Sequence, residues 1–186
     1  MAKTGEQLLE IARQFQLEGI PAQVRTLGDG FINDTFTIET EGDAPRYILQ
    51  RKNTNIFKDI PGMMSNIQAI TSHLKKKIAA AGGDPMREPL TVVPAVDGKL
   101  YHVHDGEYWC VTVFIEDSVS YDKADTTLLA ECGGRGIGRF QAMLSDFDQP
   151  LVDTLPGFHN IRFRYGQWDE TLARDPEHRA ESVREL

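Results

Sequence analysis

A glycine turn between two predicted strands constrains the fold of this chain more than any other feature. The turn, residues 27–34, reads LGDGFIND, and its two glycines flank an aspartate. Glycine accepts positive φ and carries no side chain, so the backbone can reverse sharply there. Beyond the turn, Phe36 and Ile38 alternate with threonines, which is the period of a half-buried strand. The pattern predicts a hairpin and then a third strand, over residues 22–27, 33–39 and 46–52.

The turn has two interpretations. Backbone N–H groups of such a turn can hold phosphates, because no side chain keeps the ligand away. On this interpretation the hairpin belongs to a kinase-like nucleotide-binding lobe and covers ATP. The alternative is an Asp-Gly hairpin turn that binds nothing, which is the commoner use of these residues. The turn by itself leaves both interpretations open.

One helix is predicted before the hairpin in the sequence, and another after the third strand. Thr4 and Gln7 form a capping box that begins the first helix, and Gly19 and Pro21 end it. The second helix follows Asp59, a favoured N-cap residue. Its apolar residues recur at helical spacing and form one stripe: Met63, Ile67, Ile70 and Leu74.

The remainder of the chain continues with strands and then with helices. Three apolar runs read as strands, at residues 90–96, 100–103 and 108–115. This order predicts an α+β lobe, an antiparallel sheet with its helices packed on one side. A long helix is predicted over residues 125–147, with an apolar stripe that includes Leu129, Phe140, Met143 and Phe147. Two more helices are predicted near residues 166–173 and 177–186.

Composition excludes several classes of protein. With 186 residues, of which 40% are hydrophobic, the chain is ordinary globular material. A net charge of −8 argues against a broadly basic surface for nucleic acid. Cys110 and Cys132 lack metal-ligand spacing and are expected to be reduced thiols of a cytoplasmic protein. No signal core or membrane-length apolar run occurs, so no membrane partner is expected.

Four short patterns resemble sites but have plainer explanations. His102 and His104 share a strand face without a third metal ligand. The glycines of residues 134–138 do not follow a strand, so close helix packing explains them better than dinucleotide binding. His159 and the next residue could begin a kinase catalytic loop, but isoleucine stands where the catalytic aspartate belongs. Asp146 and Asp148 read as a solvent-facing pair at a helix end.

Several separated motifs, in the right order, resemble one known family. They are the segment Gly28–Phe57, the run VFIEDSVSY from Val113 to Tyr121, the runs GRFQ at 138–141 and LSDFD at 144–148, and FHN at 158–160 with Arg164. Together they resemble N-acetylhexosamine 1-kinases, of the aminoglycoside phosphotransferase and choline kinase superfamily. The resemblance implies a protein-kinase-like amino-terminal lobe in residues 1–116. Residues 117–186 would then be a hinge and the first helices of an incomplete second lobe.

The resemblance also implies a function and a set of site residues. The activity would be ATP-dependent phosphorylation of the anomeric hydroxyl of an N-acetylhexosamine, with Mg²⁺ as cofactor. Phe31 would face the sugar, although the family commonly has histidine there; the alternative is a phenyl ring that caps the sheet. The residues expected to bind nucleotide are Gly28, Asp29, Gly30, Ile32, Asn33, Ile48, Gln50, Phe114, Ile115 and Glu116.

The third strand departs from the general kinase pattern. Matching it to the kinase V-A-I-K strand places Ile48 against adenine and Gln50 at the lysine position. The helix glutamate that pairs with this lysine is also missing, since Gln68 stands there. If phosphate needs a cation, Arg51 or Lys52 is expected to reach around the strand.

Residues for the chemical step are missing. The superfamily's H-x-D-x-x-x-x-N loop and its later metal-binding aspartate do not occur, so no catalytic or metal residue is assigned. We therefore expect the first half of a two-lobed kinase, with its Mg²⁺ ligands in the missing part. Such a half would be inactive alone and would self-associate through its exposed apolar stripe. The alternative is a complete, non-catalytic module, a pseudokinase-like nucleotide-binding or interaction protein.

Overall fold

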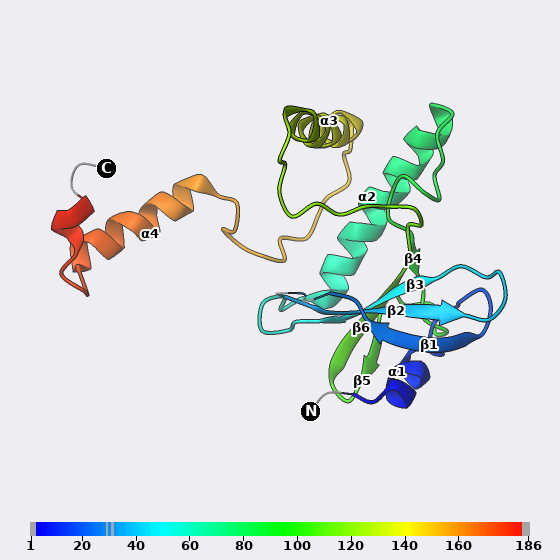
Figure 1. Cartoon of the computed structure of the whole chain (residues 1–186). Coiled ribbons are helices and arrows are strands. Elements are labelled where there is room, and N and C mark those ends of the chain that lie inside the picture. Colours follow the sequence, from blue (N-terminus) through cyan, green and yellow to red (C-terminus); the bar gives the residue numbers. More distant parts are fainter. Residues whose placement is uncertain (1–2, 29, 31, 184–186) are drawn as a thin grey trace. The chain divides into compact units, whose positions relative to one another are not determined.

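The structure, a computed structural model, describes residues 3–28, 30 and 32–183. Contacts divide the chain into two compact units, Met1–Thr154 and Leu155–Leu186. The first unit holds the sheet and three helices, and the second holds one helix and a short 3₁₀ helix (Figure 1). The helices are α1 (Gly5–Ala12), α2 (Ile60–Ala80), α3 (Thr127–Met143) and α4 (Ile161–Arg174), and the 3₁₀ helix is η1 (Ala180–Val183).

The sheet is antiparallel and six-stranded. Its order is β1-β2-β3-β6-β4, and β5 pairs with β6 off this path. The predicted hairpin and third strand are confirmed, with Asp34 opposite Arg51 and Thr35 opposite Gln50 in the β2–β3 register. The strands are β1 (Pro21–Thr26), β2 (Asp34–Thr40), β3 (Tyr47–Lys52), β4 (Val92–Val93), β5 (His102–His104) and β6 (Glu107–Val113).

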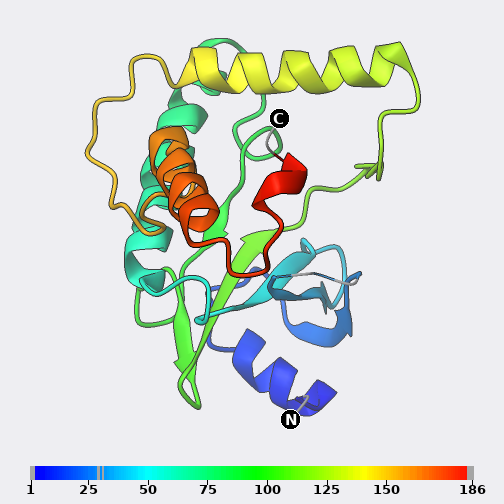
Figure 2. The same ribbon diagram turned by 90° about the vertical axis from the view of Figure 1, so that its left-hand side faces the viewer.

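The two amino-terminal helices cover opposite faces of the sheet. On one face, Ile11 of α1 joins Leu49, Trp109 and Val111 in a cluster of fully buried side chains. On the other face, Met64 of α2 packs against Cys110. Figures 1 and 2 show α1 and α2 on the two sides of the sheet. The prediction that the helices pack on one side was wrong. Trp109 and Val111 of β6 are buried on one face of the sheet and Cys110 is buried on the other, so this strand is covered on both faces.

Capping chemistry predicted the starts of these helices. The Thr4 hydroxyl accepts from the Gln7 N–H at 3.3 Å, and the Gln7 side chain accepts from the Thr4 N–H at 2.9 Å. The Asp59 carboxylate accepts from the Gly62 N–H at 2.8 Å. The predicted apolar stripe of α2 differs from the structure at two positions. There the buried residues are Met64 and Thr71, each one position after the residue that was predicted. The full buried set of α2 is Ile60, Met64, Thr71, Leu74 and Ile78.

The carboxy-terminal helices lack a buried face. Neither α3 nor α4 has a buried residue. Helix α4 begins at Ile161, five residues before the predicted start, because the Asn160 side chain caps it by accepting from the Phe163 N–H. The helix predicted from residue 177 is wrong in its described part, where η1 is the one helical turn. No helix among the described residues is long and apolar enough to span a bilayer.

Candidate functional site

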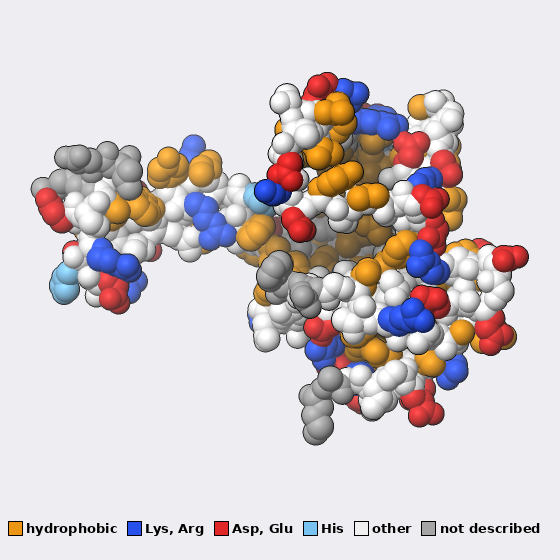
Figure 3. Space-filling view, viewed as in Figure 1, with side chains coloured by type: hydrophobic (Ala, Val, Ile, Leu, Met, Phe, Trp, Pro, Cys, Tyr) orange, Lys and Arg blue, Asp and Glu red, His pale blue; other side chains and the backbone are white. Residues whose placement is uncertain are grey.

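A groove lies on the face of the sheet that α2 covers. Its volume is about 270 Å³, just under the range of about 300–1,000 Å³ that is usual for small-molecule sites. In the space-filling view, apolar side chains surround a hollow above the sheet (Figure 3). The groove is lined by Ile48, Gln50 and Lys52 of β3, Met64 and Ile67 of α2, Leu90 and Val92, and Cys110 and Thr112 of β6.

Lys52 places a positive charge in this groove. Its ammonium donates to the Gln50 side-chain oxygen at 2.6 Å, and the Gln50 amide nitrogen donates to the Thr35 hydroxyl at 3.1 Å. Burial lowers the pKa of Lys52, and no carboxylate of the described residues lies within 4.0 Å of it. Burial also raises the pKa of its neighbour Cys110 to about 11, so that thiol is neutral at pH 7. The lysine charge is therefore not compensated within the described chain.

The position of Lys52 corrects one expectation. Side chains alternate along a strand, so Ile48, Gln50 and Lys52 share a face, and Lys52 enters the groove without reaching around the strand. Strand alternation in the sequence already puts Lys52 on this face, but the match of Gln50 to the kinase lysine led to a different expectation for Lys52. Arg51 is on the other face, and Gln68 is exposed, where it donates to Ser72 at 3.2 Å.

The predicted hinge is held by an arginine. The Phe114 N–H donates to the Arg46 carbonyl at 2.9 Å, and the Arg46 guanidinium lies 4.4 Å from the centre of the Phe114 ring. The same guanidinium bonds both carboxylate oxygens of Glu116, and its hydrogen bonds lower the pKa of Glu116. The Ile115 carbonyl accepts from the Ser118 hydroxyl at 2.9 Å. The hinge follows directly from β6, where Thr112 lines the groove opposite Ile48.

The backbone conformation of the turn and its close contacts explain the glycines at positions 28 and 30 without a ligand. Gly28 has a φ of +62°, and a Cβ on Gly30 would lie 2.4 Å from the Asn33 carbonyl oxygen. The Asn33 side chain accepts from the Asn53 N–H at 3.0 Å, which joins the turn to the end of β3. Ile32 lines a polar cavity of about 310 Å³ beside Asn53, and Lys52, which lines the groove, also lines this cavity. Asp29 and Phe31 lie outside the described residues.

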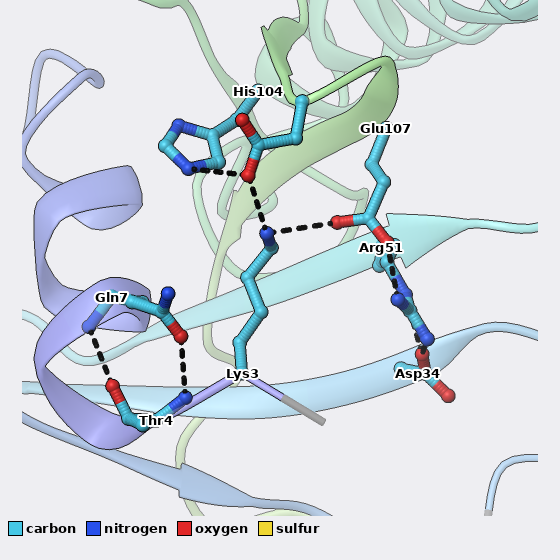
Figure 4. Close-up of polar contacts among 8 residues, drawn as sticks. Lys3, Thr4, Gln7, Asp34, Arg51, His104 and Glu107 are labelled. Atoms are coloured by element: carbon cyan, nitrogen blue, oxygen red, sulfur yellow. Dashed lines mark hydrogen bonds and ion pairs between the residues drawn. The ribbon is translucent and has the colours of Figure 1, made fainter. Parts of the chain in front are cut away.

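An ionic network joins the base of the turn to the rest of the sheet (Figure 4). The Arg51 side chain bonds the carboxylates of Asp34 and Glu107, with Nε of Arg51 2.6 Å from Asp34. Lys3 is 3.3 Å from the same Glu107 carboxylate and 3.1 Å from that of Asp105. This network depends on strand pairing, which sequence analysis did not supply.

The described structure bears on three of the four short patterns. His102 packs edge-on against Phe15, and no group of three possible metal ligands occurs among the described residues. Close helix packing does not explain the glycines of residues 134–138, because a Cβ at each would meet nothing within 4 Å. Asp146 has partners that were not predicted, since it lies 2.5 Å from Lys77 and 3.2 Å from His73.

A comparison with solved structures identifies the fold. The chain is similar to spectinomycin phosphotransferase APH(9)-Ia, solved in complex with ADP and spectinomycin. The TM-score is 0.54 at 11% sequence identity, and the match covers 96% of this chain and 48% of that protein. The predicted kinase-like amino-terminal fold is confirmed, and this chain spans about half the length of its structural neighbour. No protein-family model matches the sequence.

Proposed function

We propose that this chain is the nucleotide-binding part of an ATP-dependent phosphotransferase, with the adenine in the groove and the phosphates beside Lys52. The observation that carries the proposal is the charge on Lys52, which is partly buried beside an apolar groove and has no carboxylate partner among the described residues. A buried charge is costly unless it is paired, and a phosphate would pair it. The kinase-like fold supports the same assignment.

The groove gives each assigned residue a role in this proposal. Ile48 and Thr112 would contact the adenine beside the hinge, and the backbone of residues 114–116 would recognise its edge. Gln50 has its two amide ends bonded to Thr35 and Lys52, so we propose that it orients Lys52 instead of binding phosphate itself. Gly28, Gly30, Ile32 and Asn33, together with Asp29, are proposed to approach the phosphates from the turn.

The acceptor and the metal are assigned less directly. We propose the anomeric hydroxyl of an N-acetylhexosamine as acceptor, on the sequence resemblance, with Phe31 toward the sugar and the cytoplasm as location. Residues 1–116 are proposed as the nucleotide lobe and 117–186 as the hinge and the start of the helical lobe. The residues present offer no fitting set of metal ligands in the described chain, so no residue is assigned to Mg²⁺.

Calorimetric or NMR titrations test the nucleotide assignment. We expect weak binding of ATP, ADP and adenosine, with little enhancement by Mg²⁺. Lys52→Met should weaken ATP and ADP about tenfold, as the loss of one charge-assisted hydrogen bond would. Adenosine binding should stay the same, and Lys123→Met, which alters an exposed lysine, should change neither. Absence of all adenine-nucleotide binding at millimolar concentration would refute the nucleotide assignment. Tight binding that strictly requires Mg²⁺ would refute the expectation of half a kinase, because it would need metal ligands that the sequence analysis did not find.

Catalysis is tested separately. The purified chain with ATP should form no phosphate ester of N-acetylglucosamine or N-acetylgalactosamine, because the residue that orients the acceptor is not found in its sequence. Mass spectrometry detects the product sensitively. Sugar phosphate formed in proportion to the concentration of the chain would contradict this expectation.

A further inference from the structure

The base of the glycine turn is fastened to the middle of the sheet by one side chain. Asp34 is the last residue of the turn and the first residue of β2, and it lies opposite Arg51 in the strand register. Arg51 bonds Asp34 with one side of its guanidinium and Glu107 of β6 with the other. Because β6 pairs with β3, β4 and β5, Glu107 belongs to the strand with the most neighbours.

Two further bonds make the same junction firm. The Asn33 side chain accepts from the Asn53 N–H, and the Leu27 N–H donates to the Thr35 carbonyl at 2.8 Å across the base of the turn. Lys3 shares the Glu107 carboxylate with Arg51 and so holds that acceptor in place. The turn is therefore fixed at its base from β3 and β6, while Arg51 itself points away from the groove.

Arg51 and Lys52 are adjacent and on opposite faces of β3. A displacement of the turn relative to β3 would change the distance from the turn's N–H groups to the Lys52 ammonium. Both are needed at fixed positions to hold one chain of phosphates, since small misplacements of binding groups are costly. An arginine suits the task, because its planar fork can bond two carboxylates at once, whereas a lysine ammonium bonds them as a point charge.

We propose that Arg51 is a positioning residue that fixes the glycine turn against Lys52 for phosphate binding, acting through Asp34. The proposal rests on the proposed nucleotide site. Arg51 would touch no nucleotide itself, and its two carboxylate partners would transmit its effect. The side chains of Arg51, Asp34 and Glu107 are 34%, 47% and 31% exposed. Ion pairs that water reaches contribute little to global stability, so the loss of Arg51 should alter the turn more than the fold.

The first test needs no ligand. NMR hydrogen exchange is measured on the whole chain and on Arg51→Lys, Arg51→Gln and Asp34→Asn. The Leu27 and Asn53 amides should exchange at least about fivefold faster in all three variants, because local opening becomes easier. Amides between β3 and β6 should keep their rates. Arg135→Lys, which alters an exposed arginine paired with Glu131, is the matched control and should change nothing. Unchanged rates at Leu27 and Asn53 would overturn the proposal.

The second test separates positioning from a structural role. The Arg51 and Asp34 variants should weaken ADP about fivefold and leave adenosine within about twofold, since only the phosphates contact the turn. Equal loss for ADP and adenosine would show general damage to the fold, and no loss for either would show that the turn needs no anchor; both outcomes overturn the proposal. If the unaltered chain binds neither ligand, the proposed function fails, whereas faster exchange in the variants would still establish the anchor.

Discussion

The sheet with α1 and α2 encloses a core of its own, whereas α3 and α4 enclose none. The two tryptophans show the difference, since Trp109 is 1% exposed and Trp168 is 47% exposed. The two cysteines repeat it, because Cys110 is buried and Cys132 is exposed. Stability therefore depends on the sheet, and the apolar side chains of the later helices are available for contact.

The largest expected effect compares the two tryptophans. Trp109→Ala should lower the free energy of unfolding by about 3–5 kcal/mol, because a fully buried aromatic is replaced by a cavity. Trp168→Ala should change it by less than about 0.5 kcal/mol. Urea denaturation followed by circular dichroism measures both. Similar losses of unfolding free energy in the two variants would contradict the claim that stability depends on the sheet and not on the later helices.

A second comparison uses alkaline pH and the two cysteines. Burial raises the pKa of Cys110 from 9.0 to about 11, so the stability it contributes is complete below pH 9 and is lost as the pH rises through 11. A difference of 11 − 9 = 2 pKa units corresponds to about 2–3 kcal/mol. The stability difference between the unaltered chain and Cys110→Ala should shrink by that amount between pH 8 and 11.

Two further variants control for other groups. Cys132→Ala should show no such change, because that thiol is exposed. Burial lowers the pKa of Lys52, which acts in the opposite sense and favours the folded state as the pH rises toward 10.5. Lys52→Met should therefore make the alkaline loss steeper. A Cys110→Ala difference that is constant with pH would contradict the burial of this thiol.

The smallest effect on stability is expected on α3. Leu128, Ile137 and Phe140 are 66%, 64% and 45% exposed. Exposed apolar patches drive association, so we predict that the chain self-associates through this helix. Phe140→Asp should shift the mass from light scattering toward the 20.9 kDa monomer, with the free energy of unfolding changed by less than about 0.5 kcal/mol. A stable monomer of the unaltered chain would refute self-association.

Local chemistry made much of the first unit predictable. The capping residues Thr4 and Asp59 act within one helical turn, and the hairpin follows from glycines and alternation. The strand predicted over residues 90–96 shrank to two residues, because Pro94 has no N–H to donate to a ladder. Thr71 is buried in α2 because its hydroxyl donates to the Ile67 carbonyl at 2.8 Å, a contact that apolar spacing does not reveal.

The candidate site was less predictable, because long-range pairing makes it. Arg51 meets Glu107, and Arg46 meets Glu116, over 56 and 70 residues of chain. No periodicity indicates such partners. Lys52 was the exception, since strand alternation alone places it on the face of Ile48.

An NMR titration of the ¹⁵N-labelled chain with ADP tests nucleotide binding in the groove residue by residue. We predict that the amide shifts gather at residues 48–52 and 110–116 and in the glycine turn, while residues 161–174 of α4 stay unchanged. Lys52→Met should remove the shifts of the turn and keep those near Thr112. Shifts confined to α4, or no shifts with millimolar ADP, would contradict the claim that the groove beside Lys52 binds a nucleotide.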